Sequence, residues 1–181
     1  AVTVESFRRL RDDIELLALG SYFAQVAELL SQEDSPDPEL LSLLLNSLYA
    51  LSKLNKPQAL VKAAFEFKMA CLAGFTPDLS GCALCGSRSP DRFNVTQGVL
   101  QCADCRSPED TGLRLPISPG TLAALRYLSG ADVKRLFSFT LGPEHLRELN
   151  SLTEAYLSVQ LEHSFYGLDF YKSLFLENDY V

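Results

Sequence analysis

Four of the five cysteines in the 181-residue sequence fall into two pairs, each with the spacing Cys-x-x-Cys. The first pair is Cys82 and Cys85, and the second pair, after an interval of sixteen residues, is Cys102 and Cys105. Two cysteines three apart on a tight turn can direct both sulfurs at one ion, and a second turn must then supply the other two corners of a tetrahedron. The sequence therefore predicts one structural Zn²⁺ ion bound by these four thiolates.

Other chemistry remains open for the same four cysteines. They could form two disulfides or stay as unligated thiols, although an odd total of five cysteines argues against a disulfide framework. Four thiolates also suit iron, as in a rubredoxin-like electron carrier. A catalytic zinc ion is disfavoured, because it keeps a position open for water and usually has histidine or carboxylate ligands.

The residues around the two pairs predict a small β structure. Gly86 follows the first pair directly, where such a turn usually ends at a residue with positive φ. Arg106 takes the matching place after the second pair, so the second turn is less ideal. Between the pairs, residues 92–95 and 99–101 read as two short strands joined as a hairpin. The predicted module is a zinc ribbon with a short β-hairpin.

Helices are predicted on both sides of this module, because apolar residues recur there at helical spacing. The first helix is predicted over about residues 3–32, with a break or kink at Gly20. A second helix, over residues 40–54, is apolar on nearly all sides and is therefore predicted to be the central helix of a bundle. A third is predicted to begin at Pro57 and to end at Gly74.

The segment after the ribbon is predicted to complete the bundle. Ser118 can cap a helix, and Gly142 with Pro143 opens a last long helix that Gly167 ends. Residues 168–176 form an aromatic-rich tail that we expect to pack back on the bundle.

The predicted fold class is therefore mainly α, a helical bundle with an inserted four-cysteine zinc ribbon. We divide the chain into a first part of the bundle at 1–77, the ribbon insertion at 78–114 and a second part of the bundle at 115–181. Hydrophobic residues make up 47% of the sequence and charged residues 22%, which is typical of a globular protein. No apolar run reaches the roughly 18 residues of a membrane span, and no signal peptide is visible, so we expect a cytoplasmic protein without a membrane partner.

Basic residues supply the candidates for binding a nucleic acid or a protein. The one clearly basic stretch covers residues 53–68, where four lysines face a single acid, Glu66. Two of these lysines lie about 120° apart around a helix, so the four do not form one stripe. The candidate contacts are Lys53, Lys56, Lys62, Lys68, Arg88 and Arg92.

Common catalytic motifs are missing from the sequence. It contains no Gly-x-x-x-x-Gly-Lys phosphate loop, no Gly-x-Gly-x-x-Gly and no His-Glu-x-x-His. The histidines, His145 and His163, have no sequence neighbour that resembles a nucleophile. Glu66 lies among hydrophobic residues, where a structural hydrogen bond is expected. We predict no catalytic residue and no enzyme activity.

Residues 65–79, which end in Gly-Phe-x-Pro-x-Leu after a Phe-x-x-Lys helix, run directly into the first cysteine pair. This succession resembles the central signature of the RecO family of bacterial recombination mediators. Gly98 before the second pair also fits, as does the last helix leading through His163 to residues 168–174. The resemblance spans essentially the whole chain, and its most specific part is residues 65–105.

The resemblance implies a mediator of DNA repair and homologous recombination that is not an enzyme. Proteins of this family bind and anneal single-stranded DNA. With RecR, and usually RecF, they load RecA onto DNA coated by single-stranded-DNA-binding protein. They combine an N-terminal OB barrel with a helical domain that the zinc ribbon interrupts. No strand-rich barrel precedes Thr3, so we expect that the OB domain is absent from this sequence.

Partners and location follow from the same resemblance. We expect single-stranded DNA to bind mainly through the missing OB domain, in agreement with the formal net charge of −7. The acidic tail of single-stranded-DNA-binding protein is placed on the lysine segment 53–68, and the location is the bacterial cytoplasm at the nucleoid. The alternative function is a zinc- or iron-binding interaction or redox module unrelated to DNA.

Overall fold

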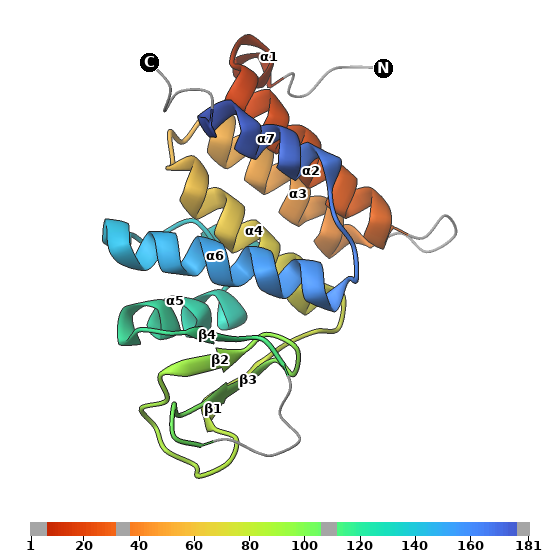
Figure 1. Ribbon diagram of the computed structural model, residues 1–181. Helices are drawn as coiled ribbons and strands as arrows, with labels where there is room; N and C mark the ends of the chain where they lie inside the picture. Colours follow the sequence, from red (N-terminus) through yellow and green to blue (C-terminus); the bar gives the residue numbers. More distant parts are fainter. Residues whose placement is uncertain (1–6, 32–36, 106–111, 177–181) are drawn as a thin grey trace.

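The computed structural model describes residues 7–31, 37–105 and 112–176, and these form a stack of helices with a small sheet at one end (Figure 1). Within this part of the chain the fold is mainly helical, as the sequence predicts. Thr3, where the first predicted helix begins, and Arg106 lie outside the described residues. No helix in the described part of the chain is long and apolar enough to cross a membrane.

The first predicted helix is divided into two, α1 (Arg8–Asp12) and α2 (Ile14–Leu30). The division falls at Asp13, whose carboxylate accepts hydrogen bonds from the backbone N–H groups of Glu15 and Leu16 at 3.0 and 3.2 Å. Such an N-cap starts a new helix. The predicted break at Gly20 is wrong, since Gly20 lies inside α2. A Cβ atom there would lie 3.4 Å from the Leu48 side chain, so the glycine allows close packing between helices.

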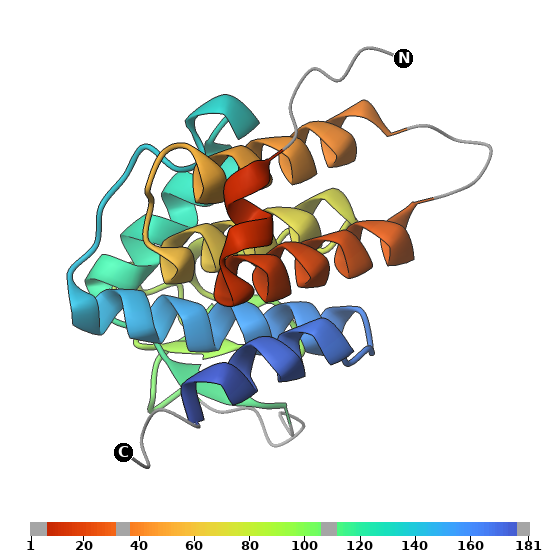
Figure 2. The same cartoon turned by 90° about the horizontal axis from the view of Figure 1, so that it is seen from above.

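Two further helices precede the sheet, α3 (Pro38–Ser52) and α4 (Gln58–Leu72). The prediction that the leucine-rich helix is the central one is wrong, because Leu41, Leu45 and Tyr49 on α3 are 54%, 45% and 45% exposed. The central helix is α4, which lies between α2 and α3 on one side and α5 and α6 on the other (Figures 1 and 2). Small residues explain this place. Alanines at 63, 64 and 70 are fully buried and let several helices approach α4 closely.

The part of the chain after the sheet contains α5 (Pro119–Gly130), the 3₁₀ helix η1 (Val133–Arg135), α6 (Pro143–Gln160) and α7 (Tyr166–Leu176). The predicted cap at Ser118 is confirmed, because its hydroxyl accepts from the N–H of Thr121. The prediction that one helix runs to Gly167 is wrong. The chain turns back after α6, and α7 packs along α2 as a separate helix, which confirms the expected packing of the tail. Gly167 permits that contact, since a Cβ atom there would lie 3.0 Å from the Tyr22 Cα atom.

Four short strands form the sheet: β1 (Asp78–Cys82), β2 (Arg92–Asn94), β3 (Val99–Gln101) and β4 (Arg114–Pro116). Their order is β1-β3-β2-β4. The predicted hairpin is confirmed as the antiparallel pair β2–β3, with Phe93 opposite Leu100 and Gly98 at φ 64° in the turn. The sequence did not predict β4, which pairs with β2, or β1, which runs parallel to β3.

We call the described residues of 78–116 the ribbon and the seven α-helices with η1 the helical body. Aromatic and polar side chains of α6 join the two: Tyr156 packs edge-on against Phe93 with ring centroids 5.3 Å apart, and its hydroxyl donates to the Phe75 carbonyl at 2.9 Å. Gln160 donates to the Val95 carbonyl at 2.8 Å. The domain limits 1–77, 78–114 and 115–181 stay a prediction.

Candidate metal centre

The two cysteine pairs come together at one end of the sheet. The sulfur atoms of Cys82, Cys85, Cys102 and Cys105 all lie within 4.8 Å of one another, and those of Cys85 and Cys102 are 3.8 Å apart. Sulfurs at the corners of a tetrahedron about 2.3 Å from a metal ion would be roughly 3.8 Å apart. All four are free thiols, so the structure does not contain the two disulfides of the alternative hypothesis. The donor set therefore fits one tetrahedral ion.

The first cysteine turn (residues 82–86) is held by its own backbone. The N–H of Cys82 donates to the Ser87 carbonyl at 2.8 Å, and the N–H of Gly86 donates to the Cys82 carbonyl at 2.8 Å. Gly86 has φ 72°, which confirms the predicted reason for a glycine at this position. A Cβ atom at Gly81 would lie 2.9 Å from the Ser87 carbonyl oxygen, so a second glycine is needed for this compact turn.

The second cysteine turn (residues 102–105) is held by side chains from outside it. Arg114 on β4 donates to the carbonyl oxygens of Cys102 and Cys105 at 2.7 and 3.1 Å. Asp91, next to β2, accepts from the N–H of Ala103 at 2.6 Å. The turn's own backbone contributes the bond from the Cys105 N–H to the Cys102 carbonyl at 3.1 Å.

Electrostatics within the cluster favour the thiolate of Cys82, and they raise the pKa of Cys102 and of Cys105. Although burial resists ionisation of Cys82, backbone N–H groups of Cys85, Leu84 and Cys102 lower its pKa to about 6. Hydrogen bonding with Cys85, together with desolvation, raises the pKa of Cys105 to about 12. Thiols this close cannot all ionise unless a cation balances them. Such a cluster suits a divalent ion, which binds thiolates and releases their protons.

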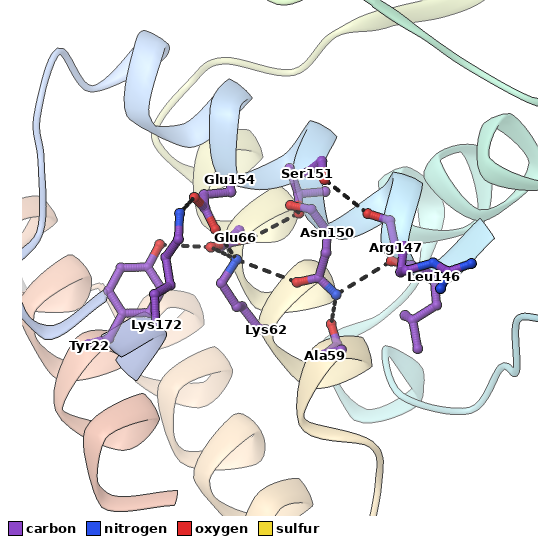
Figure 3. Close-up of polar contacts among 11 residues, drawn as sticks. Tyr22, Ala59, Lys62, Glu66, Leu146, Arg147, Asn150, Ser151, Glu154 and Lys172 are labelled. Atoms are coloured by element: carbon purple, nitrogen blue, oxygen red, sulfur yellow. Dashed lines mark hydrogen bonds and ion pairs between the residues drawn. The ribbon is translucent and has the colours of Figure 1, made fainter. Parts of the chain in front are cut away.

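The structure separates the six basic candidates into different surroundings. Lys62 is only 3% exposed, and its ammonium forms ion pairs with Glu66 and Glu154, both at 2.8 Å (Figure 3). Lys68 donates to the carbonyls of Ser129 and Ala131 at 3.3 and 3.0 Å, where α5 ends. These two lysines are therefore directed into the helical body, and neither presents a free ammonium for a DNA or protein contact.

The other four candidates lie nearer the surface, at two places. Lys53 is exposed and Lys56 half-buried where α3 connects to α4, at the opposite end of the molecule from the ribbon (Figure 1). Arg88 is exposed on the ribbon, and Arg92 is half-buried and pairs with Asp91 at 3.3 Å. The structure thus brings together the four cysteines but not the six basic residues.

Sequence reasoning missed the buried polar cluster that contains Lys62. Glu66 is fully buried and accepts from the hydroxyls of Tyr22 on α2 and Thr153 on α6, each at 2.9 Å, which confirms the expected structural hydrogen bond. Glu154 on α6 also pairs with Lys172 on α7 at 2.6 Å (Figure 3). The cluster therefore ties four helices together. The i,i+4 spacing of an acid and a lysine within an apolar helix was the signal that could have found it.

The charges of this cluster are stabilised by one another. Burial opposes the ionised form of Lys62, yet Glu66 and Glu154 together raise its pKa. Partial burial also opposes ionisation of Glu154, but Lys62 and Lys172 hold the pKa of this carboxyl below its usual range. For Glu66, burial raises the pKa against the opposing effect of Lys62. Each of these groups has a partner within the helical body, which fits a structural role.

Both histidines lie beside residues with a structural role. The Nδ1 atom of His145 lies 3.0 Å from the Ser118 hydroxyl, but that hydroxyl accepts the Thr121 N–H as the cap of α5. His163 packs edge-on against Phe165.

Comparison with known proteins finds one matching family model and several similar proteins. The family model described as Recombination protein O C terminal matches residues 11–168. A DNA repair protein RecO from Acetivibrio thermocellus is 32% identical over 173 residues, which cover 94% of this chain and 68% of that protein. The RecO protein of Symbiobacterium thermophilum is 28% identical over 176 residues, covering 94% and 69%, and that of Rubrobacter xylanophilus is 37% identical over 134 residues, covering 71% and 52%. The chain thus spans between about half and two thirds of the length of these relatives.

Proposed function

This chain belongs to the RecO family, and from that membership we propose that it is the helical and metal-binding part of a protein of DNA repair and homologous recombination. Its role is that of a non-enzymatic mediator in the bacterial cytoplasm, at the nucleoid. It acts with RecR and RecF to load RecA onto DNA coated by single-stranded-DNA-binding protein. The observation that carries the proposal is the family match over residues 11–168, which covers both the helices and the four-cysteine cluster.

The proposed cofactor is one structural Zn²⁺ ion on Cys82, Cys85, Cys102 and Cys105. The compact four-sulfur cluster supports this assignment, because structural zinc sites are closed by four protein ligands. Elemental analysis of protein purified under reducing conditions tests it. We expect a colourless protein that contains zinc. A red protein with iron in place of zinc would favour the alternative of an electron carrier, and protein without metal would exclude both.

We propose that an OB domain, and not the helical body or the ribbon, makes the main contacts with single-stranded DNA. The net charge of −7 opposes phosphate binding, which depends on clustered lysine and arginine. Fluorescence anisotropy with a labelled oligonucleotide, titrated with salt, can compare this chain with the full-length Acetivibrio thermocellus relative. We expect weaker binding and a smaller salt slope for this chain. Equal affinities and slopes would locate the principal DNA site in the helical body or the ribbon.

The acidic tail of single-stranded-DNA-binding protein is proposed to dock where α3 ends. Leu45, Tyr49 and Lys53 follow one another at intervals of four residues, so apolar and basic side chains share one exposed helix face. Lys56 lies just beyond, and Arg9 of α1 reaches the same end of α3 through its hydrogen bond with Asn55. An acidic peptide with apolar residues would complement this surface. In this proposal Lys62 and Lys68 stabilise the fold of the helical body and do not contact the acidic tail.

Charge reversal tests this docking surface. We expect the double variant Lys53→Glu, Lys56→Glu to weaken binding of a tail peptide, and more so at low salt because the contact is exposed. Arg88→Glu on the ribbon is the matched control and should leave peptide affinity unchanged. Equal affinity for all three proteins would move the docking site elsewhere.

A further inference from the structure

The two cysteine turns differ in what holds them. In the first, backbone groups of residues 82–87 bond to one another, and Ala83 N–H donates to the Leu100 carbonyl on β3 at 2.8 Å. In the second, most of the hydrogen bonds come from two side chains outside the turn, Asp91 before β2 and Arg114 on β4. Both turns must present two sulfurs to the same ion. The second turn depends for its conformation on Asp91 and Arg114, which lie outside it in sequence.

Arg114 is the side chain that contacts both ligands of the second turn. It stands on β4 opposite Asn94 of β2, and its Nη2 group donates to the carbonyls of both Cys102 and Cys105. A single guanidinium thus fixes the peptide groups of both ligands in the second turn. Its Nε atom is buried and has no hydrogen-bond partner among the described residues. A buried donor without a partner is unfavourable, so the two carbonyls must account for the position of this side chain.

Asp91 binds a backbone N–H group of the same turn. Its carboxylate accepts the Ala103 N–H at 2.6 Å, while its own carbonyl accepts the Ile117 N–H at 3.0 Å just after β4. Asp91, directly before β2, and Arg114, on β4, therefore reach residues 102–105 from two adjacent segments of the ribbon. Together they fix both the donor and the acceptor groups of the second turn.

The charge of Arg114 also suits this place. Four thiolates with one divalent ion carry a formal charge of about −2, and the guanidinium of Arg114 carries a charge of the opposite sign. We infer that Arg114, assisted by Asp91, is a positioning residue of the metal centre, which keeps the second turn in its ligating conformation and slows metal release. This inference rests on the proposed metal site and adds to it the residues that control metal retention.

The experiment measures transfer of zinc from the reduced protein to a chromogenic chelator. We expect Arg114→Met to release zinc about ten-fold faster or more than the unchanged chain, the usual size of an effect from a group next to the ligands. Arg88→Met removes a charge from the same ribbon without touching the second turn and is the matched control. We expect its release rate to equal that of the unchanged chain. Equal rates for the two variants would overturn the inference.

Conservative variants separate positioning from general damage to the ribbon. We expect Arg114→Lys, which keeps a charged donor, to release zinc more slowly than Arg114→Met, and Asp91→Ala to release it faster than the unchanged chain. The absorption spectrum of the Co²⁺-loaded protein should change in Arg114→Met and stay unchanged in Arg88→Met. If Arg114→Met takes up no metal, the release rate of Asp91→Ala against that of the unchanged chain decides. Release from Arg114→Lys as fast as from Arg114→Met, or from Asp91→Ala as slow as from the unchanged chain, contradicts the inference.

The outcome for the unchanged chain keeps the two proposals apart. If it contains no zinc and takes up no Co²⁺, the proposed metal site itself fails. If it binds metal while Arg114→Met and Arg88→Met release it equally fast, the site stands and the role of Arg114 fails.

Discussion

The helical body and the ribbon each gather ionisable groups, but they balance them in different ways. In the body, Lys62, Glu66, Glu154 and Lys172 supply two positive and two negative charges, and each has a partner within 2.8 Å. In the ribbon, four thiols lie within 4.8 Å of one another and can ionise together only if a cation joins them. The charges of the body are therefore balanced by its own residues, whereas the four thiols of the ribbon are placed where a metal ion could bind.

The body and the ribbon share one hydrophobic cluster, to which the ribbon contributes the smaller part. Large buried side chains such as Phe23, Phe65 and Met69 pack together in the body, and Phe23 stacks on Phe65 with ring centroids 4.0 Å apart. In the ribbon the fully buried large residues are Phe93 and Leu100. So few buried residues rarely stabilise a fold alone, and small modules commonly depend on a metal ion. Losing the ion should then affect the ribbon and spare the body.

The largest expected effect comes from removing one ligand. Cys102→Ser should lower the zinc content from about one ion per chain to a small fraction, because a closed site requires all four ligands. Helical circular dichroism and the cooperative unfolding of the helices should persist. Hydrogen exchange would show fast exchange in residues 92–101 and protection in α4. A global loss of helical signal would show that the body depends on the ribbon.

The next effect concerns the buried charges of the body. Lys62→Met leaves Glu66 and Glu154 without their buried partner, which typically costs about 3–5 kcal/mol in the free energy of unfolding. Lys172→Met removes the half-exposed partner of Glu154 and should cost no more than about 1 kcal/mol. Urea unfolding of both variants provides the measurement. Similar losses for the two would mean that burial does not set the cost.

Local and distant information separate what the sequence could predict from what it could not. The cysteine turns and the hairpin β2–β3 are local, so spacing and turn residues predicted them. The pairing of β1 with β3, and the meeting of Lys62 with Glu154, depend on contacts between distant segments. The prediction that the leucine-rich helix is the central one failed for the same reason. Side-chain size along α4, and not hydrophobicity alone, decides how many helices can approach it.

A smaller effect is expected at the junction of the two regions. Gly98 has φ 64°, and a Cβ atom there would lie 2.7 Å from the Tyr156 hydroxyl. Gly98→Ala should lower the free energy of unfolding by about 1–3 kcal/mol through backbone strain and displacement of Tyr156. Gly130→Ala, at a helix end with nothing within 4 Å of the added atom, is the control and should be nearly neutral. Equal midpoints of thermal unfolding for the two variants would show that α6 can shift to accommodate the added methyl group.

The smallest expected effect is the response of the body's cluster to acid. Because Lys62 and Lys172 lower the pKa of Glu154, the folded chain binds fewer protons at this carboxyl than the unfolded chain does. The contribution of Glu154 to stability is therefore complete above the ordinary glutamate pKa and is lost as the pH falls through the lowered value. We expect Glu154→Gln to be less stable than the unchanged chain at pH 7, with the difference shrinking toward pH 3. Glu28→Gln, at an exposed position on α2, should follow the unchanged chain throughout. A Glu154→Gln difference that stays constant from pH 7 to pH 3 would show that hydrogen bonding, and not charge, accounts for this residue's part in the cluster.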